Sequence, residues 1–126
     1  MNLVSTYVHL KPDRLAALEP VTETFWPTIE TRSDLDPGQL VMRFDFTGDW
    51  PTWEVHPAGD EIVTLLSGEA EMVLRTAKGD ERVHLKTPGD FVVVPKGVWH
   101  TGKHRVPTSM LFITPGEGTE NRAAPP

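Results

Sequence analysis

The feature that most constrains the fold is a series of short apolar segments, each closed by a turn signal rich in glycine or proline. In the first of them Leu40, Met42 and Phe44 alternate with Val41 and Arg43, as in a half-buried strand. Segment starts recur roughly every 8 to 12 residues, a rhythm typical of antiparallel sandwiches and barrels. We therefore predict an all-β fold with further strands at Trp53–His56, Ile62–Leu66, Ala70–Arg75, Glu81–Leu85, Phe91–Val94, Val98–Lys103 and Ser109–Thr114.

The length of 126 residues predicts one domain with a barrel over 39–114. Residues 1–38 are expected to form an N-terminal arm packed on the barrel. A short helix is predicted over Lys11–Glu19, because Pro12 suits a first helical turn and Pro20 ends the segment. The polar stretch 115–126 is expected to be a fraying C-terminal tail.

Charge and composition exclude several classes of function. The net charge of −6 repels nucleic acid and anionic lipid surfaces, so we expect neither as a partner. The chain has no cysteine, so any metal site must use histidine, aspartate or glutamate. The N-terminus lacks the basic and apolar pattern of a signal peptide, and we expect a cytoplasmic protein.

Two stretches place metal-ligating residue types at spacings that a barrel can bring together. Glu54 and His56 are two residues apart on an expected strand, so their side chains leave the same face. Glu61 follows a four-residue turn and can approach that pair. In the second stretch a strand leads into a Pro-x-Gly turn that precedes His100, and His104 follows four residues later.

These stretches resemble the two motifs of the cupin superfamily, a double-stranded β-helix or jelly-roll barrel. The first motif is Gly, five residues, His-x-His, three or four residues, Glu, six residues, Gly. The second is Gly, five residues, Pro-x-Gly, two residues, His, three residues, Asn. Every spacing matches, with glycines and proline at Gly48, Gly68, Gly89, Pro95 and Gly97.

The resemblance implies that Glu54, His56, Glu61 and His100 bind one divalent transition metal. A donor set of two imidazoles and two carboxylates suits iron, manganese or nickel, with zinc as a further option. The chain departs from the family pattern in two places: Glu54 replaces the first histidine, and His104 replaces the asparagine. Glu54 can therefore be a ligand, a hydrogen-bond partner of His56 or a general base, whereas Glu61 is either a ligand or a solvated carboxylate.

The leading hypothesis is a metal-dependent oxidoreductase, most plausibly a dioxygenase, that acts on a small organic acid or phenolic molecule. A lyase or isomerase is the next choice. Glu54 and His104 are the candidate catalytic residues, with His104 either lining the cavity or lying at the surface. The same residues leave two alternatives open: a non-catalytic barrel that binds or senses a small ligand, and a metal-free isomerase or cyclase that uses Glu54 with His56.

A homodimer is expected, because small cupins often pair through N-terminal strands. The arm carries apolar side chains that would otherwise be exposed, namely Val21, Phe25, Trp26 and Ile29. Met42, Phe44, Met72 and Phe112 are predicted to form the inner wall of the barrel.

Overall fold

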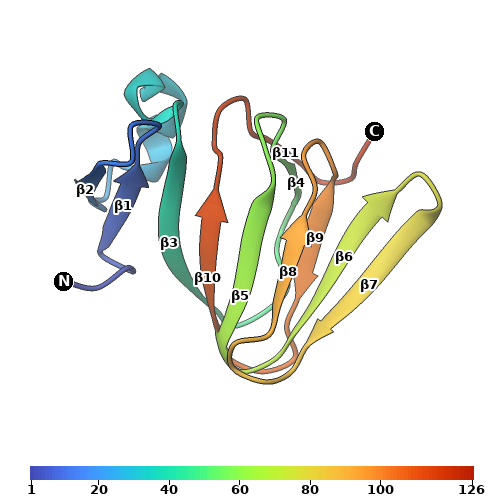
Figure 1. The fold of residues 1–126 in the computed structure, drawn as a ribbon. Helices are drawn as coiled ribbons and strands as arrows, with labels where there is room; N and C mark the ends of the chain where they lie inside the picture. The colour runs from blue at the N-terminus through green and yellow to red at the C-terminus, as the bar shows by residue number, and fades with distance from the viewer.

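The computed structural model describes all 126 residues and contains two antiparallel β-sheets (Figure 1). The six-stranded sheet has the order β2 (Ala16–Pro20), β1 (Thr6–Leu10), β3 (Gln39–Phe46), β10 (Thr108–Thr114), β5 (Glu61–Ser67) and β8 (Phe91–Val94). The five-stranded sheet has the order β11 (Glu120–Arg122), β4 (Trp53–Val55), β9 (His100–Lys103), β6 (Ala70–Thr76) and β7 (Gly79–Leu85). The predicted all-β jelly-roll barrel is confirmed, and each strand predicted between 40 and 114 is present.

The core lies between the two sheets and follows from the period-two pattern of the strands. Along β5, Val63 and Leu65 are fully buried, Thr64 between them is half-buried, and the flanking Ile62 and Leu66 are exposed. Of the predicted inner wall, Met42, Met72 and Phe112 belong to the buried core cluster, and Phe44 is partly buried and packs against it. Alternation therefore assigns one face of each strand to the interior.

The predicted helix over Lys11–Glu19 is wrong. This segment is the turn and second strand of a hairpin, in which Leu10 pairs with Ala16 and Thr6 with Pro20. Two 3-10 helices follow instead, η1 (Trp26–Thr31) and η2 (Ser33–Leu35). The apolar residues that suggested a helix do not form a buried face, since Leu15 is 64% exposed. Pairing of this edge strand with β1 outweighs the local helix signals.

The C-terminal segment is also more ordered than predicted. Residues Glu120–Arg122 form β11, which pairs with β4 so that Asn121 lies opposite Glu54. The expectation of a fraying tail is therefore wrong for this strand. Its partner, β4, carries Glu54 and is followed directly by His56, so the C-terminal segment lies beside the site.

The apolar side chains of the N-terminal arm pack largely on the barrel of their own chain. Phe25 is only 3% exposed and meets the Tyr7 ring edge-on at 5.3 Å. Val21 and Ile29 pack against the core, and Trp26 alone remains largely exposed. These residues thus do not require a second subunit to cover them, and the homodimer stays a prediction.

None of the helices has the length and apolar composition needed to cross a bilayer.

The turn between β5 and β6 supplies a test of the fold. Gly68 has φ +83°, and a Cβ there would lie 2.4 Å from the Pro107 carbonyl oxygen. Gly79 has φ +107° but open space around it. We expect Gly79→Ala to lower the free energy of unfolding by about 1–2 kcal/mol and Gly68→Ala by about 3 kcal/mol or more, measured by urea denaturation. Equal losses would contradict the proposed close approach of the two turns.

Candidate metal centre

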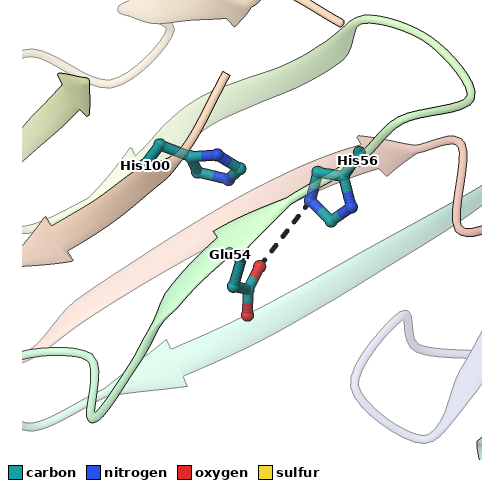
Figure 2. Close-up of side chains that lie close together, drawn as sticks. All are labelled: Glu54, His56 and His100. Atoms are coloured by element: carbon teal, nitrogen blue, oxygen red, sulfur yellow. Dashed lines mark ion pairs between the residues drawn. The ribbon is translucent and has the colours of Figure 1, made fainter. Parts of the chain in front are cut away.

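The structure brings the predicted site residues together at one end of the barrel interior. Glu54 and His56 come from β4 and the residue after it, and His100 opens β9 directly opposite Glu54. One potential ligand atom from each of these three residues lies within 4.8 Å of the others. Figure 2 shows the three side chains gathered between the ribbons, with the Glu54 carboxylate 3.7 Å from His56 Nε2.

Glu61 reaches the same place from the opposite sheet, at the start of β5. Its side chain is only 2% exposed. Its Oε1 lies 3.0 Å from His100 Nε2, and its Oε2 lies 3.2 Å from His56 Nε2. The alternative of a solvated carboxylate at Glu61 is therefore wrong, and the sequence motif has correctly grouped all four residues in space.

Hydrogen bonds from neighbouring segments orient these side chains. Thr114 Oγ1 donates to Glu61 Oε2 at 2.5 Å, and Thr119 Oγ1 lies 2.8 Å from His56 Nδ1. His100 Nδ1 lies 3.1 Å from the Val98 carbonyl oxygen, which can only accept. His100 therefore carries its proton on Nδ1 and, when neutral, directs the Nε2 lone pair toward Glu61.

Three buried polar atoms at the centre of the group have no hydrogen-bond partner: His56 Nε2, His100 Nε2 and Glu61 Oε1. They are close to one another but not aligned as donor and acceptor. Such atoms are costly to bury unless a proton or a cation lies between them. Two imidazole nitrogens facing carboxylate oxygens form a donor set that fits a divalent metal ion.

Burial and neighbouring side chains shift the pKa values of the two carboxyl groups in the site. Burial acts to raise the pKa of Glu61, but contacts with the His100 and His56 rings outweigh it and lower the pKa to about 2. Burial and the neighbouring Glu61 charge instead raise the pKa of Glu54. Without a cation, the pocket therefore places a firmly ionised carboxylate beside a second carboxyl group that ionises less readily.

A cavity of about 540 Å³ opens onto this group. Glu54, His56 and Glu61 line one part of it, and the aromatic side chains of β3 and β10 line another. Trp50 lines the cavity, whereas Arg75 stacks over the Trp53 ring and Arg122 over the Trp99 ring.

His104 lies behind the cavity wall rather than in the cavity, and it is only 5% exposed. Its ring stacks on Phe46 at 4.8 Å, and its Nε2 accepts a hydrogen bond of 3.0 Å from the Trp50 indole. Its Nδ1 lies 3.2 Å from the Glu69 carbonyl oxygen. Because both nitrogens are engaged and burial lowers the pKa of His104, the geometry favours a role in positioning Trp50. The acid–base role stays a prediction.

Sequence reasoning did not identify Thr114, Thr119 or the contact between Trp50 and His104. Thr119 lies in the segment expected to fray, where only a Gly-x-Gly pair suggested an ordered turn. The Trp50 contact depends on Gly102, where a Cβ would lie 2.6 Å from the indole ring. A glycine inside an expected strand is a signal of such a close approach.

The positioning role of His104 predicts a specific pattern of rescue. His104→Phe keeps the stacking on Phe46 but removes the acceptor, so it should lower the free energy of unfolding by about 1–3 kcal/mol and shift the tryptophan emission. His104→Gln can supply an amide oxygen to the indole and should recover most of the emission and of any activity. If His104→Gln is as inactive as His104→Phe while its emission is native, His104 acts as an acid or base.

Comparison with known proteins supports the same architecture. A family profile described as "Cupin domain" matches residues 40–114. No match was found among curated protein sequences.

Solved structures with the same fold include three of particular interest. A cupin-2 domain protein from Shewanella frigidimarina is 23% identical, with 62% of this chain and 71% of that chain aligned at a TM-score of 0.53. Hydroquinone 1,2-dioxygenase from Sphingomonas with 4-hydroxybenzoate bound is 20% identical, with 61% and 59% aligned at 0.52. Fe(II)-HppE with an alternative substrate is 20% identical, with 62% and 43% aligned at 0.52. The chain thus spans less than two thirds of the latter two proteins.

Proposed function

The chain belongs to the cupin family, and we propose that it binds one divalent transition metal through Glu54, His56, Glu61 and His100. With that metal it acts as an oxidoreductase of the dioxygenase type on a small organic molecule. The observation that carries the proposal is the set of three buried, unpartnered nitrogen and oxygen atoms at the centre of the group. A cation placed among them would satisfy all three at once.

The ligand types favour iron, manganese or nickel, with zinc as a further option, because two imidazoles and two carboxylates form a hard to borderline donor set. The two carboxylates also balance the charge of a divalent ion. One structural neighbour, Fe(II)-HppE, supports iron by its name. When bound, iron of this kind lets a substrate and dioxygen react side by side.

The residues around the metal position have distinct expected roles. Thr114 and Thr119 hold Glu61 and His56 in place through their hydroxyl groups. Glu54 is the most exposed of the four, with about a third of its side chain accessible (32%), and it lines the cavity. It is therefore the group placed to accept a proton from a substrate hydroxyl.

Metal loading tests the proposal directly. Wild-type protein should hold about one equivalent of metal after incubation with Fe(II), Mn(II), Ni(II) or Zn(II), and His100→Ala should hold less than about a tenth. His84→Ala is the matched control, because His84 also lies near a carboxylate, 3.3 Å from Glu71, but half of its side chain is exposed (52%). Metal content is measured by plasma mass spectrometry. A wild-type protein that stays below a tenth of an equivalent would sink the proposal.

Thr119→Val should weaken metal binding without removing a ligand. The hydroxyl group orients His56, and partners of this kind change metal affinity by about 10- to 100-fold. Thr87→Val is the control, since Thr87 is exposed and does not line the cavity. Competition with a chromophoric chelator measures both affinities. Equal affinities for the two variants would show that Thr119 does not support the site.

Oxygen uptake separates the dioxygenase from the other reactions. Fe(II)-loaded protein should consume dioxygen in proportion to product, because a dioxygenase transfers both oxygen atoms to its substrate. Turnover without oxygen uptake would favour a lyase or isomerase. Activity that survives chelation but is lost in Glu54→Gln would favour the metal-free isomerase or cyclase.

We further propose a homodimer. The outer face of β5 and its neighbour β8 exposes apolar side chains at Ile62, Leu66, Phe91 and Val93, which a second copy could cover. Light scattering at micromolar concentration should give the dimer mass, and a monomer peak would contradict it.

A further inference from the structure

We propose that the cavity selects an uncharged aromatic hydroxy compound, a phenol, over an organic acid or a phosphorylated compound. For the metal end of the cavity this inference rests on the proposed function. It follows from two properties of the lining: the absence of a free cation and a continuous aromatic wall.

The lining of the cavity is acidic. Glu30, Asp36, Glu54 and Glu61 all contribute to it, and beside the His56 imidazole Arg32 is its only lysine or arginine. An anionic ligand that enters such a cavity loses its hydration and meets like charges. Without a cation to pair with, a buried carboxylate or phosphate group is strongly disfavoured.

Arg32 is not available as that cation. Its Nη1 donates to Glu19 at 2.6 Å, and its Nε and Nη2 donate to the two oxygens of Asp34, both at 2.9 Å. All three guanidinium nitrogens are therefore engaged by two carboxylates of the same chain. These ion pairs join Arg32 to Glu19 of β2, and the two carboxylates leave no net positive charge facing the cavity.

The metal end does not compensate for this. A divalent ion held by Glu54 and Glu61 carries no net charge together with its two carboxylates, in contrast to an ion held by histidines alone. An incoming acid would add a third negative charge, whereas a neutral hydroxyl group adds none. The replacement of a histidine by Glu54 thus bears directly on which ligand is accepted.

The aromatic lining of the rest of the cavity suits a planar ring in the ligand. Five aromatic side chains line it, and four of them form a row of neighbouring rings. The ring centroids are 5.5 Å apart for Trp26 and Phe44, 5.5 Å for Phe44 and Phe112, and 5.7 Å for Phe112 and Trp50. Trp50 in turn meets the His100 ring at 6.0 Å. This wall leads from the exposed Trp26 to the candidate ligands, and edge and face contacts with aromatic rings favour a planar apolar ligand.

The test compares two probes that differ in charge. 4-Ethylphenol is neutral near neutral pH, whereas 4-ethylbenzoate is ionised. Titration calorimetry is run on metal-free and on Zn(II)-loaded protein, since zinc has no redox chemistry. We expect 4-ethylphenol to bind at least about tenfold more tightly than 4-ethylbenzoate in both forms. Equal or tighter binding of the benzoate, or no binding of either probe, would overturn the inference.

A second arm frees the paired cation. The variant Glu19→Gln/Asp34→Asn releases Arg32 toward the cavity and should raise the affinity for 4-ethylbenzoate several-fold while that for 4-ethylphenol stays the same. Glu71→Gln/Asp80→Asn is the matched control, because it changes the net charge equally but releases Arg82 and Arg75 outside the cavity. If both variants gain the same benzoate affinity, or neither gains any, the pairing of Arg32 does not set the selectivity.

Zinc uptake is measured separately from the binding of the two probes. A protein that takes up no zinc but still prefers 4-ethylphenol contradicts the proposed function and supports this inference. A protein that takes up one equivalent of zinc and prefers 4-ethylbenzoate does the reverse.

Discussion

The arrangement on which the site depends is the contact of one buried carboxylate with two imidazoles across the gap between the sheets. Glu61 comes from β5 of the six-stranded sheet, and His56 and His100 come from the β4 and β9 side of the other. The contact joins the two sheets at one end of the barrel but leaves nitrogen and oxygen atoms without hydrogen bonds. A cation bound to these atoms would offset the free-energy cost of burying them and would link the two sheets.

Glu54 gives this site its individual chemistry. It lies at the cavity side of the group and directly opposite His100 in the sheet, so it adds a negative charge where the family pattern has a neutral imidazole. The charge balance of the proposed metal site and the acidic lining of the cavity then act in the same direction. Both disfavour an anion, and the aromatic wall favours a ring.

The sequence was sufficient for the barrel and for the grouping of Glu54, His56, Glu61 and His100 in space, because alternating apolar residues and turn glycines fall at spacings that only a few topologies satisfy. It was insufficient where tertiary contacts outweigh local signals. Lys11–Glu19 has helix start and stop signals but pairs with β1, and Thr119 orients His56 from a segment with no periodicity. The contact of His104 with Trp50 joins residues far apart in the chain, and Gly102 signals a close approach there without naming the partner.

The central claim is that one metal ion occupies the space between Glu54, His56, Glu61 and His100. Anomalous diffraction from crystals grown with Mn(II) tests it most directly, since the signal locates the ion itself. The account predicts a single strong peak within coordination distance of His56 Nε2, His100 Nε2 and both carboxylates, at about 2.0–2.3 Å. Ordered side chains around a site with no peak, or a peak bound elsewhere on the protein, would contradict it.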